Sequence, residues 1–288
     1  MRSYLFVPAD SLRKFEKARH SAADTLILDL EDSVAHTAKE SARLSLATML
    51  QAPRGKQKFF VRINALDTNQ SIYDLAAAMP FRPDGIVLPK AGCGRDVTLL
   101  SNWLDAFEVS YNLSLGITKI IAIVTETAQV LFQMASFTGS SDRLCGMMWG
   151  AEDLAASLGA IENRSGTSYS APFLMARNLC LAGAAAAGVD AIDAVCTDIE
   201  DIQRIENEAV QARRDGFAGK AIIHPNHIAV VNDAFSSKVE EVIWANKVVS
   251  AFQENPDAGV IRIDGQMIDK PHMRTALKIL ERCHTGEV

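Results

Sequence analysis

The sequence lacks the features that mark several large classes of protein. None of its five cysteines forms a Cys-x-x-Cys pair, and their odd number does not suit a full set of disulfides. No run of about 18 apolar residues is present, so we expect no membrane span. The N-terminus does not have the layout of a signal peptide. Free thiols in a reducing compartment fit these absences, and we expect a cytoplasmic protein.

Positive charge is also scarce. The 35 acidic residues outnumber the 29 basic ones, which gives a formal net charge of −6. This balance disfavours nucleic-acid binding through a broad basic field. Neither a P-loop nor a Gly-x-Gly-x-x-Gly pattern is present, so the usual nucleotide-binding fingerprints are absent. No His-x-x-x-His motif or cysteine cluster occurs, which argues against a zinc site.

Apolar runs of strand length alternate with longer helical segments along most of the chain. Most of these runs are continuously apolar, as expected for strands that are buried on both faces of a parallel sheet. Eight β-α units in about 230 residues match a (β/α)8 barrel, and a doubly wound open sheet is the alternative. We therefore predict an α/β protein with a TIM barrel over residues 1–235. The expected strands are residues 4–8, 25–29, 58–63, 85–89, 119–125, 144–149, 191–196 and 221–224, and the expected helices include residues 11–21, 38–51, 96–111, 171–188 and 200–216.

The pattern changes after the eighth expected strand. Residues 228–235 and 239–254 look helical, and a stretch rich in Gly, Pro and Asp follows them. A short β-like run at 260–263 then leads to a last helix at about 271–283. We predict that residues 236–288 form a helical extension of the barrel, either a lid or an arm that reaches a neighbouring subunit.

Polar side chains follow the carboxyl ends of the expected strands, where the chemistry of such barrels is found. Glu126 and Asp153 are candidates for a metal site, because Mg²⁺ is usually held by one or two carboxylates together with water and substrate oxygens. Arg62 is a cation inside an apolar strand, so it needs a partner. That partner is a substrate carboxylate, held in a bidentate manner, or an ion pair with Asp29 or Glu31, and the two are compatible.

Three further features leave alternatives open. Lys90 is a Schiff-base lysine or, as we favour, an ion-pair partner of the nearby carboxylates. His224 is a metal or proton-transfer residue or, as we favour, a residue that closes the eighth strand with a local hydrogen bond. Arg2 and Lys17 belong to a basic cluster around the first strand and helix, which is either a solvated helix face or a site for ligand phosphates.

Seven segments carry a family resemblance: residues 2–9, 29–34, 61–64, 88–90, 126–128, 150–155 and 219–225. Together these segments resemble the citrate lyase β-subunit-like family of the HpcH/HpaI aldolase superfamily, which includes malyl-CoA and citramalyl-CoA lyases. The resemblance runs in order from Arg2 to the final helix, so it is far more specific than a single short motif.

The resemblance implies a TIM barrel that binds Mg²⁺, with Mn²⁺ as the alternative, and that acts on an acyl-CoA. It implies that Glu126 and Asp153 are the metal ligands and that Arg62 holds the carboxylate of the keto acid or hydroxy acid. Arg2 and Lys17 match positions near the phosphates of CoA.

The resemblance also assigns a role to the C-terminal extension. Asp269 matches an acid/base aspartate on an arm that, in the family, closes the site of an adjacent subunit in trimers or hexamers. The alternative for Asp269 is an ordinary helix N-cap before Lys270 and Pro271. The resemblance thus implies that the protein is a homotrimer or a hexamer. The net charge and the lack of a long apolar run let us expect neither a nucleic acid nor a membrane as partner.

The resemblance implies a carbon–carbon lyase. It would cleave a 3-hydroxy-3-carboxyacyl-CoA to acetyl-CoA and an α-keto acid by retro-aldol chemistry, with citramalyl-CoA favoured over malyl-CoA. Asp269 would move the proton at the acetyl group. One alternative is a thioesterase that hydrolyses malyl-CoA or citramalyl-CoA. Another is a citrate lyase β subunit that acts on a citryl-acyl-carrier protein.

Overall fold

The computed structural model describes the backbone of residues 1–285 and the side chains of residues 1–281, so the side chain of Cys283 lies outside the described part. The chain divides into two compact units, Met1–Phe235 and the residues from Ser236 onward. The first unit holds a closed barrel of parallel strands in the order β1-β10-β9-β6-β5-β4-β3-β2. Its closure between β1 and β10 excludes the open doubly wound sheet. The barrel strands are β1 (Ser3–Pro8), β2 (Thr25–Asp29), β3 (Lys58–Arg62), β4 (Gly85–Leu88), β5 (Lys119–Ile123), β6 (Leu144–Met148), β9 (Asp190–Asp193) and β10 (Gly219–Ile222).

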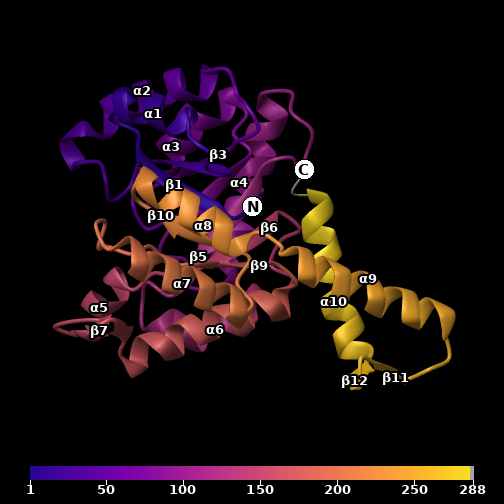
Figure 1. Ribbon diagram of the computed structural model, residues 1–288. Coiled ribbons are helices and arrows are strands. Elements are labelled where there is room, and N and C mark those ends of the chain that lie inside the picture. The colour runs from indigo at the N-terminus through magenta and orange to yellow at the C-terminus, as the bar shows by residue number, and fades with distance from the viewer. Residues whose placement is uncertain (286–288) are drawn as a thin grey trace. The chain divides into compact units, whose positions relative to one another are not determined.

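Helices follow the strands and cover the outside of the barrel (Figure 1). The connection between β5 and β6 carries two short 3-10 helices instead of an α-helix, and a small hairpin that the sequence analysis does not predict precedes α6. The α-helices of this unit are α1 (Leu12–Arg19), α2 (Lys39–Gln51), α3 (Ser71–Ala78), α4 (Gly94–Ser110), α5 (Glu152–Leu158), α6 (Ala171–Ala187), α7 (Ile202–Asp215) and α8 (Ile228–Phe235). The 3-10 helices are η1 (His36–Ala38), η2 (Met79–Phe81), η3 (Gln129–Phe132), η4 (Met134–Phe137) and η5 (Pro225–His227), and the hairpin is β7 (Arg164–Ser165) with β8 (Ser168–Tyr169).

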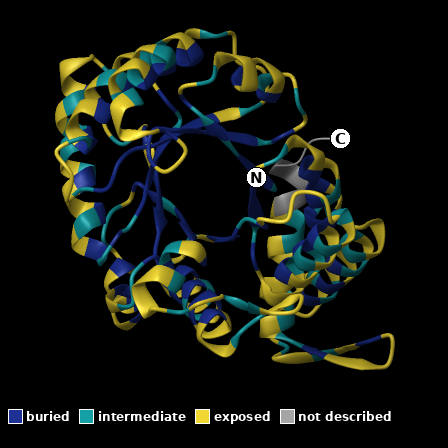
Figure 2. Ribbon diagram, turned by 90° about the vertical axis from the view of Figure 1, so that its left-hand side faces the viewer, coloured by how far each residue is buried: buried dark blue, intermediate teal, exposed yellow. Residues whose placement is uncertain are grey.

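Two apolar layers explain why the strands read as continuous apolar runs. Neighbouring residues of a strand point to opposite faces. In β2, Ile27 packs with Tyr4 and Phe60 in the cluster that fills the barrel, whereas Leu26 and Leu28 pack in the layer between strands and helices. Both layers are buried, and Figure 2 shows the dark blue strands inside a ring of helices whose outer faces are exposed. The sequence-based prediction of a parallel barrel is confirmed.

Two glycines allow neighbouring strands to approach where the barrel is tightest. A Cβ atom at Gly85, at the start of β4, would lie 2.2 Å from the ring of Phe60. A Cβ atom at Gly219, at the start of β10, would lie 2.6 Å from the carbonyl oxygen of Arg2. Because a real side chain cannot occupy either position, these strands require glycine at their first residue.

The second unit is a helical pair with a β-hairpin between its members. It contains α9 (Val239–Glu254), β11 (Val260–Ile263), β12 (Gln266–Asp269) and α10 (Lys270–Thr285). Asp264 and Gly265 both have positive φ, at 50° and 83°, which is typical of a two-residue hairpin turn. Phe252, Ile268 and Ala276 are buried in a small core of this unit. The sequence analysis predicts β11 but not β12, whose last residue is Asp269. In the part of the chain that the structure describes, no helix is long and apolar enough to cross a membrane.

Candidate active site

A cavity of about 820 Å³ lies at the carboxyl ends of the barrel strands. Apolar residues such as Phe6, Ile123 and Met148 form much of its wall. The polar part of the wall includes side chains at the ends of the strands or just after them. Residues of this part include Asp29, Asp32, Arg62, Glu126 and Asp153. The cavity therefore combines an apolar interior with charged groups at its mouth, as small-molecule sites do.

Arg62 ends β3 and is 9% exposed. Its guanidinium donates two parallel hydrogen bonds of 2.7 Å each to the carboxylate of Asp29, at the end of β2. Burial acts to lower the pKa of Arg62, but Asp29 outweighs burial and raises it. Burial acts to raise the pKa of Asp29, but Arg62 outweighs burial and lowers it. The remaining terminal nitrogen of Arg62 lies 3.1 Å from Glu31 and 3.3 Å from Asp32. That nitrogen is the part of Arg62 best placed to meet an anionic ligand, because Asp32 is exposed and can yield.

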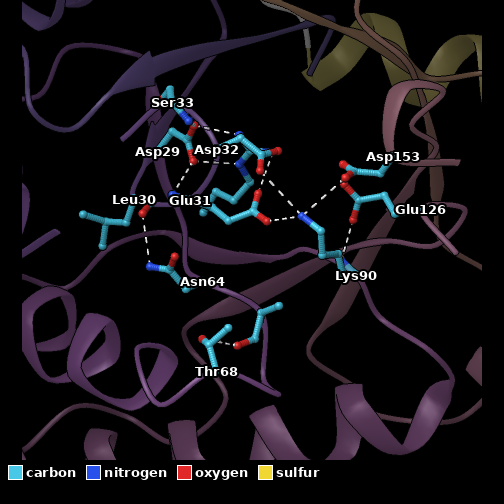
Figure 3. Close-up of polar contacts among 12 residues, drawn as sticks. Asp29, Leu30, Glu31, Asp32, Ser33, Asn64, Thr68, Lys90, Glu126 and Asp153 are labelled. Atoms are coloured by element: carbon cyan, nitrogen blue, oxygen red, sulfur yellow. Dashed lines mark hydrogen bonds and ion pairs between the residues drawn. The ribbon is translucent and has the colours of Figure 1, made fainter. Parts of the chain in front are cut away.

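Glu126 follows β5 and is held beside the end of β6 by a pair of hydrogen bonds. The hydroxyl of Thr125 donates to the carbonyl oxygen of Gly150 at 3.0 Å and accepts from the N–H of Gly150 at 2.8 Å. Gly150 leads into α5, whose second residue is Asp153. This pair of hydrogen bonds holds the two strand ends together, and the carboxylates of Glu126 and Asp153 lie side by side (Figure 3).

The surroundings of Glu126 do not favour its negative charge. The residue is 5% exposed, and its carboxylate accepts a hydrogen bond from the main-chain N–H of Lys90. Burial, together with the nearby charges of Glu31 and Asp153, nevertheless raises the pKa of Glu126 to about 8. Asp153 has the benefit of the N-terminal end of α5, where the helix dipole favours negative charge.

The residues present fit a hard divalent cation. Glu126 and Asp153 offer two adjacent carboxylates, and Mg²⁺ needs only one or two from the protein when water and substrate oxygens complete its shell. Glu31 adds a buried carboxylate oxygen that accepts no hydrogen bond from the described residues, although Arg62 lies near it. In the described part of the chain, no group of three or more His, Cys, Asp and Glu residues is arranged to hold a metal. The site therefore suits a cation that shares its ligands with a substrate.

Lys90 stands at the centre of these carboxylates (Figure 3). Its ammonium is paired with Glu31 and lies 3.6 Å from Asp32 and 3.7 Å from Asp153. Although burial acts in the opposite direction, the bond to Glu31 raises the pKa of Lys90. A lysine nucleophile must lose its proton, so this environment disfavours the Schiff-base alternative and supports the ion-pair role.

The two residues expected near CoA phosphates are found in different places. Lys17 belongs to α1 and lines the cavity, together with Arg13 and Lys14 of the same helix. Arg2 precedes β1, at the amino-terminal end of the barrel, and its guanidinium is bound to Asp24 at 2.8 Å. Of the described residues, those that line the cavity do not include Arg2. The structure therefore does not bring Arg2 to the cavity together with Lys17, because β1 lies between Arg2 and the mouth of the barrel.

Asp269 belongs to the second unit and ends β12. Its carboxylate lies 2.5 Å from the ring Nδ1 of His272, one turn along α10, and this hydrogen bond lowers the pKa of Asp269. The main-chain N–H of His272 also points to the Asp269 carboxylate, at 3.4 Å. Asp269 therefore makes the kind of contact that the N-cap alternative predicts, at the start of α10. Its acid/base role remains a prediction.

This chain is similar to several known proteins. Residues 2–225 match the family described as HpcH/HpaI aldolase/citrate lyase. The chain belongs to this family. It is 33% identical over 284 residues to a (3S)-malyl-CoA thioesterase from Cereibacter sphaeroides, with 98% of this chain and 94% of the relative covered. It is 31% identical to the citrate lyase subunit beta of Haemophilus influenzae, with 99% and 97% covered.

A solved structure is similar to this chain over nearly its whole length. The crystal structure of protein CitE from Mycobacterium tuberculosis, in complex with magnesium, acetoacetate and coenzyme A, has a TM-score of 0.79 and 35% identity, and it covers 99% of this chain and 98% of that one. The family, the barrel fold and the lyase class that the sequence predicts are confirmed. The substrate is not decided by these relatives, because one is named a thioesterase and the other a citrate lyase subunit.

Sequence reasoning misses parts of this site. It identifies Lys90 as an ion-pair partner but does not reveal that one ammonium faces three side-chain carboxylates. It also assigns no role to Phe6, whose ring lies 4.7 Å from the Arg62 guanidinium. The position of Phe6 two residues before the end of β1 is the signal that could have placed it at the mouth.

Proposed function

We propose that the chain is a divalent-cation-dependent lyase that cleaves a 3-hydroxy-3-carboxyacyl-CoA to acetyl-CoA and an α-keto acid by retro-aldol chemistry. The favoured substrate is citramalyl-CoA. One observation carries the proposal: a single cavity contains the buried Arg62 guanidinium and the adjacent carboxylates of Glu126 and Asp153. An anion-binding group beside a cation-binding pair suits a substrate that carries a carboxylate next to a hydroxyl.

Glu126 and Asp153 would hold the cation, with Mg²⁺ favoured and Mn²⁺ as the alternative. When bound, such a cation would supply Lewis-acid stabilisation of the negative charge on the substrate hydroxyl oxygen as that oxygen loses its proton, before the C–C bond breaks. Arg62 would bind the substrate carboxylate and fix its direction, because Asp29 already holds the guanidinium in one orientation. The complex of the similar CitE protein with magnesium, acetoacetate and coenzyme A supports a site that takes a divalent cation together with a carboxylic acid and CoA.

The basic residues of α1 would bind the phosphates of CoA. Lys17, Arg13 and Lys14 line the same cavity and are exposed, so their charges are available to a ligand. Asp269, on an arm from a neighbouring subunit of a trimer or hexamer, would donate or accept the proton at the methyl carbon of the acetyl group. His272 would orient that carboxylate through the hydrogen bond between them.

The wall of the cavity favours a small keto acid. Among the described residues that line it, Arg62 is the one cation on a barrel strand, and the others belong to α1. Oxaloacetate would bring a second carboxylate that needs its own cation, whereas the methyl group of pyruvate suits apolar neighbours such as Ile123 and Met148. This difference supports pyruvate or glyoxylate as the released acid and citramalyl-CoA or malyl-CoA as the substrate.

Two other outcomes remain candidates because relatives carry them. A thioesterase acting on malyl-CoA or citramalyl-CoA is supported by the 33% identical (3S)-malyl-CoA thioesterase. A citrate lyase β subunit acting on a citryl-acyl-carrier protein is supported by the relative from Haemophilus influenzae.

Product analysis with the purified chain tests the proposal. The chain is incubated with Mg²⁺ and citramalyl-CoA, malyl-CoA or citryl-CoA, and the products are identified by mass. Acetyl-CoA with pyruvate, lost on addition of EDTA, is the expected result. Free CoA with citramalate would make the chain a thioesterase. Turnover seen only when citryl-acyl-carrier protein is supplied would make it a carrier-dependent subunit.

A further inference from the structure

Lys90 contacts the acidic cluster in an unusual way. It follows β4 and has a positive φ of 51°, a conformation that residues other than glycine seldom adopt. In this conformation its main-chain N–H points to Glu126, while its side chain turns toward Glu31, Asp32 and Asp153 (Figure 3). One residue therefore touches both proposed metal ligands, and it does so with two different groups.

The cluster contains more negative than positive charge. Its five carboxylates belong to Asp29, Glu31, Asp32, Glu126 and Asp153. The ion pairs that the structure describes for them come from two cations, Arg62 and Lys90. Arg62 serves the Asp29 side of the cluster, so Lys90 is the cation on the side of the proposed metal ligands. A divalent cation would enter a region where one positive charge is already present.

The contacts of the Lys90 ammonium are unequal. Its bond to Glu31 is close, and Glu31 is itself held by Arg62 at 3.1 Å. Its distance to Asp153, 3.7 Å, is too long for a hydrogen bond, so that contact is an electrostatic attraction alone. Lys90 can therefore release Asp153 without losing its anchor on Glu31.

We propose that Lys90 is the internal counter-cation of the metal site: it neutralises Asp153 while no divalent cation is bound, and it competes with the divalent cation for that carboxylate. The inference rests on the proposed metal role of Glu126 and Asp153. Lys90 is thus a positioning residue that keeps like-charged carboxylates together and at the same time weakens metal binding.

The physical reason is repulsion between like charges at short range. An ammonium and a divalent cation that share one carboxylate repel each other, and each lowers the affinity of the carboxylate for the other. Replacing the ammonium with a neutral amide removes the competitor but keeps a hydrogen-bond donor for Glu31. The affinity of the site for the divalent cation should therefore rise when Lys90 is replaced. If Lys90 merely supported the site, its replacement would lower that affinity.

Calorimetric titration of the full-length protein with MgCl₂ tests the proposal. Lys90→Gln should lower the dissociation constant for Mg²⁺ by about tenfold, since removal of one adjacent unit charge is a large effect at this range. Lys90→Arg retains the charge and should stay within about threefold of the native value. Lys58→Gln is the matched control, because Lys58 pairs with Asp84 at the other end of the barrel, and it should leave the constant unchanged.

Thermal unfolding keeps the test decisive if the variant folds poorly. In EDTA, Lys90→Gln should unfold at a lower temperature than the native protein, and Mg²⁺ should restore more of the loss than it adds to the native protein. A variant that stays unfolded in Mg²⁺, or that binds Mg²⁺ as weakly as the native protein or more weakly, would overturn the proposal for Lys90 alone. Failure of the native protein to bind any divalent cation would overturn the metal site and the Lys90 proposal together.

Discussion

Asp29 holds both donors of one edge of the Arg62 guanidinium, through two hydrogen bonds of 2.7 Å. The two residues end adjacent strands and are paired in the barrel register, so the parallel sheet itself places them opposite each other. Asp29 is held in turn by the main-chain N–H groups of Glu31 and Ser33, at 2.9 and 3.1 Å. The Arg62 guanidinium is therefore fixed before any substrate arrives, which reduces the entropy lost on binding.

Arg62→Lys should impair substrate binding more than it impairs folding. A lysine keeps the charge but cannot form the paired bonds to Asp29 or present a planar donor to a carboxylate. We expect kcat/KM for the acyl-CoA substrate to fall by about tenfold to hundredfold. Steady-state kinetics measures this, and Arg54→Lys serves as control because Arg54 pairs with Asp84 outside the cavity. Equal losses in the two variants would show that Arg62 does not meet the substrate.

Removing either proposed metal ligand should weaken Mg²⁺ binding. Glu126→Gln and Asp153→Asn keep the shape of the side chain but remove the anionic oxygen, and a site with two protein carboxylates depends on both. We expect the dissociation constant for Mg²⁺ to rise by at least about 100-fold, since even the loss of an outer-shell partner costs 10- to 100-fold.

Glu152→Gln is the control for this pair of variants. Glu152 is the neighbour of Asp153 on α5, but its carboxylate is exposed and accepts a hydrogen bond from Asn163. Its replacement should leave the affinity for Mg²⁺ unchanged. Weakened binding in all three variants would indicate a diffuse effect of negative charge in place of a site with two ligands.

The sequence is sufficient to predict the barrel because continuous apolar runs indicate strands that are buried on both faces. Most of the eight runs are apolar on both faces, and in β2 both Ile27 and Leu28 are fully buried. The carboxylates at the strand ends follow from the same pattern, because a residue just after a buried strand must lie at the mouth of the barrel. Glu126 and Asp153 could therefore be paired before their geometry was known.

Contacts between strands are harder to predict from one sequence. Arg2 lies next to an apolar strand and looks similar to Lys17 in sequence, but β1 separates the two along its length. The direction of the strand, not the type of residue, decides which of them reaches the cavity. The hairpin strand β12 is missed because Gln266 and Asp269 carry little β propensity, and only the turn at Asp264 and Gly265 pairs it with β11.

A second buried ion cluster should control stability toward acid. Asp193 is 3% exposed and pairs with Lys220, which is 1% exposed, at 2.8 Å and with Arg177 at 3.1 Å. Burial acts in the opposite direction, but Lys220 and Arg177 outweigh it and lower the pKa of Asp193. A lowered carboxyl pKa adds stability above the pKa of the unfolded chain, about 3.9, and this stability is lost as the pH falls through the folded value.

Asp193→Asn should therefore lower the free energy of unfolding at pH 7 by roughly 3–5 kcal/mol, because Lys220 keeps a buried charge without its closest partner. It should also flatten the fall in stability below about pH 4. Urea unfolding at several pH values measures both effects. Asp215→Asn is the control, since Asp215 is more exposed and pairs with Arg177 but not with Lys220 in the described ion pairs. An equal loss in the control would show that burial of the pair is not the cause.

The role of Asp269 can be tested together with its reach between subunits. Asp269→Asn should abolish most turnover but leave Mg²⁺ binding intact, because Asp269 is not among the proposed ligands. Arg62→Ala should be inactive for a different reason, the loss of the substrate carboxylate clamp. The two variants thus carry complementary defects, one on the arm and one in the barrel.

Co-expression of Asp269→Asn with Arg62→Ala separates an arm that serves its own barrel from one that serves a neighbour. If the arm acts on an adjacent subunit of a symmetric oligomer, random mixing unites an intact Arg62 with an intact Asp269 in about a quarter of the sites. Mixed oligomers should then recover about that share of native kcat, whereas each variant alone stays inactive. An arm that serves its own barrel can never combine the two intact residues, so persistent inactivity of the mixture would reject the intersubunit role and leave Asp269 to act, if at all, within its own chain.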